Sequence, residues 1–176
     1  MLTFTVLKKI RLVALVLLNT AFAVFSASAV EQTAIEALSI KNLKTHDNNQ
    51  FSGGQPTQQQ LAKLAKLGVQ NIINLRPLSE QNWNEKQYVE SLGMKYYSIP
   101  VAGLKGLTTG NADKLKRLLD KVADQSAFVH CASGNRVGAL KAISVFNKTA
   151  NIENAIAEGK NWGLTKLEPI IRKQLN

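Results

Sequence analysis

Residues 127–140 read AFVHCASGNRVGAL and bring Cys131, the only cysteine of the chain, within five positions of Arg136. The mostly apolar residues 127–130 before the cysteine predict a short buried strand. Apolar side chains recur at helical spacing over residues 137–146 and predict a helix after the arginine. The stretch therefore predicts a strand, a tight turn and a helix, with Cys131 and Arg136 on the turn between them.

The rest of the chain alternates predicted strands with predicted helices. Residues 69–75 and 94–99 have the composition of strands. Thr57 and Gln60 form a capping box at the start of a helix that Gly68 ends. Further helices are predicted over 79–92, after the glycine-rich loop 101–111, and, once or twice, over 152–176. This alternation indicates a single α/β domain with a mostly parallel central sheet flanked by helices.

The N-terminal residues have the three-part layout of a secretory signal peptide. Basic residues precede an apolar run over 12–25, and small residues at 26–29 form a cleavage site. We therefore expect residues 1–29 to be removed near Ala29 and the protein to be exported, to the periplasm or beyond, without stable membrane insertion. The alternative is an uncleaved N-terminal anchor. Residues 30–50 are predicted to be a lead-in segment that ends in a loop, and residues 51–176 the α/β domain.

The charge of the chain favours small anionic partners. Its 22 Lys and Arg against 12 Asp and Glu give a formal net charge of +10, which attracts phosphate esters and other oxyanions. The basic residues form no dense run with interleaved aromatic residues, so nucleic-acid binding is not expected. With only His46 and His130 as histidines, no metal site and no cofactor are predicted. The sequence predicts no particular oligomeric state.

The presence of a single cysteine, Cys131, in a protein expected to be exported needs an explanation. Cys131 has no second cysteine with which to form a disulfide within its chain. Disulfides are the usual use of cysteine in an exported protein, so a free thiol there suggests chemistry. The alternative is a structural cysteine that packs as a small apolar residue.

The residues around Cys131 favour chemistry, because they form a predicted oxyanion site. Ligands of open α/β sheets bind at the carboxyl ends of the strands, which is where Cys131 is predicted to lie. Gly134 and Asn135 are expected to accept positive φ in a turn whose N–H groups converge beside a helix N-terminus. This environment stabilises a Cys131 thiolate, and the planar guanidinium of Arg136 can hold two oxygens of a tetrahedral oxyanion. The predicted catalytic residues are Cys131 and Arg136, and the predicted substrate-binding residues are Ala132, Ser133, Gly134 and Asn135.

Three further residues are candidates for a supporting role. His130 could orient the turn, act as a general base or be a core histidine. Arg76 follows a predicted strand at the same sheet edge, where it could add a positive contact or pair with Glu80 or Glu85 at the surface. Asp113 is the first acidic residue after the strand 94–99, and either a general acid or a helix cap would explain it.

The motifs resemble those of a known family. The segment HCASGNR at 130–136 resembles the signature loop of cysteine-dependent protein phosphatases. The segments SGGQPT at 52–57, GVQNIINLRP at 68–77 and YYSIPV at 96–101 are similar to the phosphatase-like domain of β-lactamase hydrolase-like proteins, bacterial relatives of the dual-specificity phosphatases. The resemblance implies a cysteine-phosphatase fold in which Cys131 forms a phosphocysteine and Arg136 holds the phosphoryl oxygens. It also implies that residues 53–55 border the pocket.

The sequence departs from that family in two places. The phosphatase loop resembles H-C-x-x-G-x-x-R-[ST], whereas here only four residues separate Cys131 from Arg136 and Val137 replaces the hydroxyl residue. This shorter spacing resembles the loop of rhodanese-type sulfurtransferases, which carry a persulfide. Residues 101–112 also contain no carboxylate that could serve as the general acid. Three functions therefore stay open: an exported phosphatase-like hydrolase of phosphate monoesters, a sulfurtransferase or persulfide carrier, and an anion-binding module without turnover.

Overall fold

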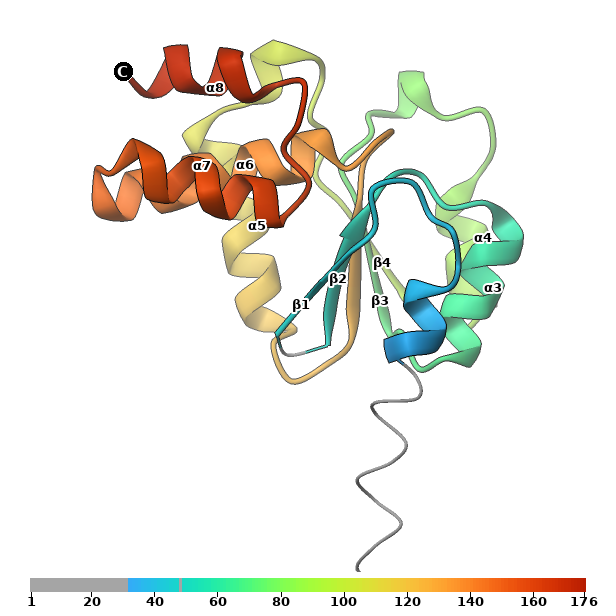
Figure 1. Cartoon of the computed structure of the whole chain (residues 1–176). Coiled ribbons are helices and arrows are strands. Elements are labelled where there is room, and N and C mark those ends of the chain that lie inside the picture. Colours follow the sequence, from blue (N-terminus) through green and yellow to red (C-terminus); the bar gives the residue numbers. More distant parts are fainter. Residues whose placement is uncertain (1–31, 48) are drawn as a thin grey trace, which may run out of the picture.

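The protein is described by a computed structural model of residues 32–47 and 49–176 (Figure 1). The predicted signal peptide, residues 1–29, lies outside the described residues. Five strands form one sheet in the order β1-β2-β5-β3-β4. β1 is antiparallel to β2, and the other neighbours are parallel. The strands are β1 (Lys44–His46), β2 (Gln50–Gly53), β3 (Asn71–Asn74), β4 (Lys95–Ser98) and β5 (Ala127–His130).

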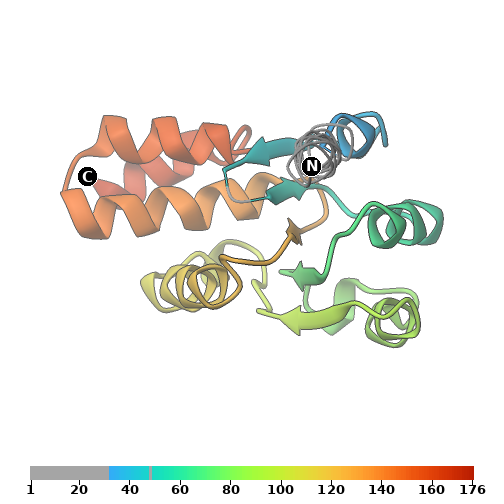
Figure 2. The same ribbon diagram turned by 90° about the horizontal axis from the view of Figure 1, so that it is seen from below.

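Helices cover both faces of this sheet, which confirms the predicted α/β architecture. The helical elements are α3 (Gln58–Lys66), the 3-10 turn η1 (Leu78–Glu80), α4 (Glu85–Ser91), the 3-10 turn η2 (Leu104–Gly106), α5 (Thr109–Lys121), α6 (Asn135–Thr149), α7 (Ile152–Asn161) and α8 (Glu168–Leu175). α3 and α4 lie on one side of the sheet and α5 and α6 on the other, with α7 packed along α6 (Figures 1 and 2). None of the helices in the described part of the chain has the length and apolar character to cross a membrane.

The central strand β5 is held from both faces. Val129 packs in the apolar cluster formed with α5 to α8, whereas its neighbour Phe128 packs in the cluster formed with α3 and α4. Ile73 and Ile72 of β3 divide between the same two clusters. Successive side chains of a strand point to opposite faces, so a sheet covered on both faces buries every residue of its central strands. The end of β5, where Cys131 follows, is therefore firmly positioned.

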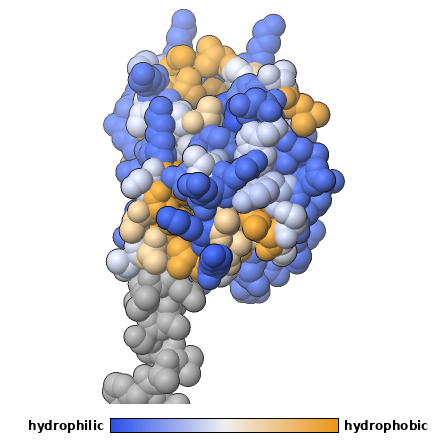
Figure 3. Space-filling model, turned by 90° about the vertical axis from the view of Figure 1, so that its right-hand side faces the viewer, coloured by the Kyte–Doolittle hydropathy of each residue, from blue (hydrophilic) through white to orange (hydrophobic). Residues whose placement is uncertain are grey.

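The helix α3 begins as the sequence predicts. The Gln60 N–H donates to Thr57 Oγ1 (3.1 Å), and the Thr57 N–H donates to Gln60 Oε1 (2.8 Å). Gly68 follows the helix with φ of 90°. The apolar side chains of α3 and α4 face the sheet, and the outer surface on this side is mainly hydrophilic with separate apolar patches (Figure 3).

The segment 79–92 differs from the single helix that its sequence predicts. It divides into η1, which ends at Glu80, and α4, which begins at Glu85. Asn84 ends the connection between them, because its side chain accepts a hydrogen bond from the Gln87 N–H (3.1 Å) and caps α4. The break leaves Glu80 on a short turn at the carboxyl edge of the sheet.

The prediction of a frayed lead-in with a loop over residues 30–50 is wrong for the part that the structure describes. Lys44–His46 pair with β2 as the edge strand β1. Ile35 and Ile40 are buried in the cluster under α3. Three residues are too few to show the alternation of apolar and polar side chains that identifies a strand. Lys44–His46 are recognised as a strand only through their pairing with β2.

Candidate functional site

The turn that follows β5, residues 131–135, is named here the cysteine loop. Cys131 lies at its start with 1% of its surface exposed. Gly134 has φ of 80° and is the N-cap of α6, as expected for a glycine in the tight turn. Of the two residues able to take positive φ, only Gly134 does so, and Asn135 is already the first residue of α6. The site residues 131–136 therefore lie where β5 meets the start of a fifteen-residue helix.

The cysteine loop is fixed by the strand end beside it. The Cys131 N–H donates to the Gly53 carbonyl (3.4 Å), and the Gln55 N–H donates to the Ala132 carbonyl (3.5 Å). Gly54 and Ser133 form an isolated antiparallel bridge. Residues 53–55 thus border the cysteine loop, and their place beside a substrate pocket stays a prediction.

Two asparagines fix the loop from its other side. The Asn42 amide donates to the carbonyls of Ser133 (3.1 Å) and Gly163 (2.9 Å). The Asn135 side-chain oxygen accepts from the Thr165 N–H (2.9 Å), so this side chain holds the connection between α7 and α8. The backbone N–H of Asn135, at the start of α6, is a donor that could bind an anion.

Arg136 already holds a carboxylate. Its Nη1 and Nη2 atoms donate to Oε1 and Oε2 of Glu80 (2.9 and 2.6 Å), and Nη1 also donates to the Val101 carbonyl (2.7 Å). The guanidinium also lies close enough to Cys131 for the two groups to attract each other. Burial disfavours its charge, but the hydrogen bond with Glu80 and the attraction of Cys131 outweigh burial and raise the pKa of Arg136. The predicted oxyanion clamp is thus paired with an acidic side chain of the same molecule.

Arg76 supports the same carboxylate from the other side. Its Nε lies 3.7 Å from Glu80 Oε2, and its terminal nitrogens donate to the Glu80 carbonyl and to Gln55 Oε1. Of the two partners considered for Arg76, the structure therefore selects Glu80. The hydrogen bond from Arg136, the largest influence, lowers the pKa of Glu80, and partial burial opposes it only in part. The sequence indicates the pair of Arg76 and Glu80, which are four positions apart, but no local signal indicates the pair of Glu80 and Arg136.

Behind the loop lies a second carboxylate that is fully buried. Glu85 Oε1 lies 2.6 Å from His130 Nε2, and neither side chain is more than 1% exposed. Glu85 Oε2 accepts from the amides of Gln55 (2.8 Å) and Asn74 (3.2 Å). His130 also stacks on Phe128. These contacts fit the interpretation that His130 orients the loop from within the core.

Asp113 does not have the position that its sequence context predicts. α5 begins at Thr109, and the Thr108 hydroxyl caps it by accepting from the Asn111 N–H (3.2 Å). Because Thr108 takes the capping role, Asp113 lies in the second turn of α5, and its interpretation as a helix cap is wrong. Within residues 32–47 and 49–176, Asp113 makes no hydrogen bond or ion pair, including none with Arg136.

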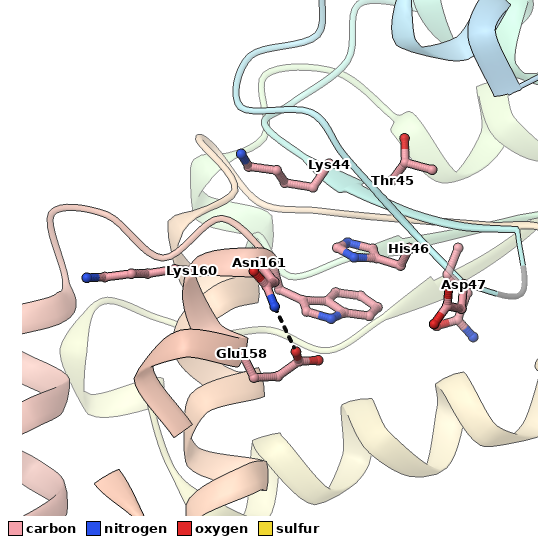
Figure 4. Close-up of a pocket in the computed structure, with 9 residues that line it drawn as sticks. Lys44, Thr45, His46, Asp47, Glu158, Lys160 and Asn161 are labelled. Carbon is pink, nitrogen blue, oxygen red and sulfur yellow. Dashed lines mark hydrogen bonds between the residues drawn. The ribbon is translucent and has the colours of Figure 1, made fainter. Parts of the chain in front are cut away.

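A surface hollow of about 600 Å³ lies apart from the cysteine loop, between β1 and the end of α7 (Figure 4). Neither Cys131 nor Arg136 lines it. The His46 ring stacks on Trp162 with 3.7 Å between centroids. Burial, with help from nearby lysines, lowers the pKa of His46 to about 4, so its ring is neutral at pH 7. In the described part of the chain, no three His, Cys, Asp or Glu side chains lie together in a way that would hold a metal ion.

Comparison with known proteins gives a family match over most of the chain. Residues 19–166 match the model of a family described as DSP-PTPase phosphatase fused to NAD+ kinase. A β-lactamase hydrolase-like protein of Xylella fastidiosa is 32% identical over 96 residues, which are 52% of this chain. The matched segment spans only 22% of the length of that relative.

Solved structures share the fold. A DUF442 protein of Shewanella putrefaciens CN-32 has a TM-score of 0.57 and 22% identity, covering 80% of this chain and 95% of its own. The kinase associated phosphatase, with its catalytic site cysteine replaced by serine, has a TM-score of 0.62 and 14% identity, covering 78% of this chain and 93% of its own. At these identities the likeness establishes the fold.

Proposed function

The chain belongs to the DSP-PTPase phosphatase family, and we propose that it is an exported hydrolase that cleaves phosphate monoesters through a phosphocysteine on Cys131. The observation that carries this proposal is the contact of Arg136. Both of its terminal nitrogens bind the two oxygens of one anionic group, the Glu80 carboxylate, while the same guanidinium lies close enough to Cys131 for the two groups to attract each other. A phosphoryl group presents two oxygens to the same planar fork.

The proposed reaction has two steps. In the first, the Cys131 thiolate attacks phosphorus, and the bond between phosphorus and the ester oxygen breaks. Arg136 and the N–H groups at the start of α6 hold the phosphoryl oxygens as negative charge develops on them. In the second, water attacks the phosphocysteine and releases inorganic phosphate and the thiolate.

Replacement of either predicted catalytic residue tests this function. We expect the protein to release p-nitrophenol from p-nitrophenyl phosphate, Cys131→Ser to release none above background, and Arg136→Lys to lose about a hundredfold in kcat/KM because the bidentate contact is lost. Arg117→Lys on the exposed side of α5 is the matched control and should behave as the parent protein. Full activity in Cys131→Ser would exclude a phosphocysteine.

The short spacing between Cys131 and Arg136 favours a second candidate, a sulfurtransferase or persulfide carrier. Incubation with thiosulfate and cyanide tests it, because Cys131-dependent thiocyanate without phosphate release would replace the phosphatase proposal. Intact mass supplies a second readout: a persulfide adds about 32 Da and is removed by a thiol reductant, whereas a sulfinic acid of similar mass is not. Phosphate binding by calorimetry with no product in either assay would instead indicate a binding module.

Export is tested separately from catalysis. We expect the full chain, expressed in a bacterium, to be recovered from the periplasm with a new N-terminus near Val30. An intact N-terminus on membrane-associated protein would indicate an uncleaved anchor.

A further inference from the structure

We propose that Glu80 is the proton donor of the proposed phosphatase reaction, displaced from Arg136 when the phosphoryl oxygens of the substrate take its place. The inference rests on the proposed function. It supplies the acid that the loop 101–112 lacks. It differs from the role that the sequence suggests for Glu80, that of a surface partner of Arg76.

The position of Glu80 carries the first step of the argument. Its two carboxylate oxygens bind both terminal nitrogens of Arg136, and the Arg136 guanidinium lies close enough to Cys131 for the two groups to attract each other. A single guanidinium therefore separates the carboxylate from the nucleophile. A phosphoryl group bound between Cys131 and Arg136 would come directly against Glu80.

The contact is also replaceable. The Glu80 side chain is 34% exposed, and it belongs to η1, a turn of three residues in which Leu78 is 84% exposed. Solvent reaches the Glu80 side of this ion pair, so a phosphoryl group, which carries more negative charge than a carboxylate, can compete for Arg136. Arg76 keeps its hydrogen bond to the Glu80 carbonyl throughout, which keeps the displaced side chain near the site.

Displacement changes the protonation of Glu80. In the structure the hydrogen bond from Arg136 holds the pKa of Glu80 below its usual value. Once the phosphoryl oxygens take that hydrogen bond, Glu80 loses its main stabilising partner and gains a negative neighbour, and both changes favour the protonated carboxyl. Substrate binding thus prepares the acid at the moment when it is needed.

The proton balance of the reaction then closes. As the bond between phosphorus and the ester oxygen breaks, its electron pair goes to the leaving oxygen, which takes the proton of Glu80. In the second step the Glu80 carboxylate accepts a proton from the attacking water, and the phosphorus–sulfur bond breaks to return the thiolate. Glu80 takes up its proton from solvent when the substrate displaces it, and it releases a proton to solvent when phosphate leaves and the ion pair with Arg136 forms again. Each residue then ends in the state in which it began.

Other carboxylates near the loop fit this role less well. Glu85 is buried and already bound by His130, Gln55 and Asn74. Asp113 has no hydrogen bond or ion pair in the described part of the chain. Glu80 is the carboxylate that contacts Arg136 there.

A series of leaving groups tests the proton transfer. Parent protein, Glu80→Gln and Glu90→Gln, a control on the exposed face of α4, are assayed with p-nitrophenyl phosphate, phenyl phosphate and an alkyl phosphate. A good leaving group needs little protonation, so we expect Glu80→Gln to lose at most about threefold in kcat with p-nitrophenyl phosphate and about a hundredfold or more with phenyl phosphate. The kcat of Glu80→Gln should also lose the decline on the alkaline side of its pH profile.

The displacement has its own readout, which does not depend on turnover. Because a glutamine side chain carries no charge, we expect Glu80→Gln to bind inorganic phosphate about tenfold more tightly by calorimetry than the parent protein does. An equal loss of kcat on all three esters, or a steep leaving-group dependence in Asp113→Asn instead, would overturn the assignment of the acid. Unchanged phosphate affinity in Glu80→Gln would overturn the displacement. Absence of phosphate release from every ester by the parent protein would instead refute the proposed function, and the proton donor with it.

Discussion

Two glutamates flank the cysteine loop, and their surroundings differ. Glu85 lies behind the loop, 1% exposed, and is bound by His130 and by the amides of Gln55 and Asn74. Glu80 lies in front of it, 34% exposed, and is bound by Arg136 and Arg76. Glu85 belongs to a helix that packs on the sheet, whereas Glu80 belongs to a three-residue turn.

The difference shows that the cysteine loop has one buried ionic contact that holds it in place, Glu85 with His130, and one partly exposed contact that a ligand can replace, Glu80 with Arg136. Removing one partner from a buried pair leaves the other desolvated and alone, so the pair of Glu85 and His130 is costly to break. Glu80 is 34% exposed and Arg136 is 12% exposed, so solvent can replace part of what this pair loses, and the pair of Glu80 and Arg136 costs less to break. The first arrangement positions the loop, and the second leaves room for a competing anion.

The largest expected effect comes from the buried carboxylate. Glu85→Ala should lower the free energy of unfolding by about 3–5 kcal/mol, because His130, Gln55 and Asn74 lose their common acceptor. Glu80→Ala should lower it by less than about 1 kcal/mol. Urea unfolding followed by circular dichroism measures both. Similar losses for the two variants would contradict the distinction between the buried contact of Glu85 and the partly exposed contact of Glu80.

A smaller effect on stability is expected at Gly134, in the cysteine loop itself. In Gly134→Ala the new Cβ would lie 2.8 Å from the Asn42 amide nitrogen on a residue with φ of 80°. We expect a loss of about 2–3 kcal/mol in the free energy of unfolding from strain and displacement of Asn42. Gly103→Ala is the control, since it also has positive φ but open space around the Cβ, and should lose about 1 kcal/mol. Equal losses would mean that Asn42 does not hold the loop.

The smallest effect concerns His46, the chain's other histidine. Among residues 32–47 and 49–176 it has no carboxylate partner of the kind that His130 has. Its pKa lies at about 4 in the folded protein, against an ordinary value of 6.5. The unfolded chain therefore binds the proton first as the pH falls from 6.5 to about 4, so acid lowers the free energy of unfolding. The loss should be about 2 kcal/mol, less than the whole shift implies, because the ring is partly exposed. His46→Phe, which keeps a ring against Trp162, should unfold with a flatter pH dependence over this range, and an unchanged slope would contradict the assignment.

The sequence predicts the features that depend on near neighbours. The strand Ala127–His130 is found with the predicted limits, and Thr57 with Gln60 forms the predicted capping box. Both follow from residues a few positions apart, since an apolar run between polar turns and a hydroxyl three residues from a glutamine each have few local alternatives. The order of these elements is sufficient to predict the parallel sheet.

The parts of the site that the sequence does not predict depend on distant pairs. Glu80 and Arg136 are 56 positions apart, and their contact exists only because the fold brings the ends of β3 and β5 to one edge of the sheet. β1 becomes a strand only through its pairing with β2. The prediction that Asp113 caps the helix is wrong for a simpler reason: α5 begins at Thr109, and Thr108 caps it.

The long-range hydrogen bonds of Asn42 have a practical consequence for choosing fragments of the protein to express. This side chain binds the carbonyl of Ser133, 91 positions away, and that of Gly163, 121 positions away. A fragment that starts at Phe51 would keep every predicted catalytic residue. It would lack Asn42, the donor to these two carbonyls, and it would lack β1, so that the edge of β2 would be unpaired. The smallest unit expected to fold with an intact cysteine loop therefore starts ahead of the buried Ile35, and shorter expression fragments should yield aggregated or inactive protein.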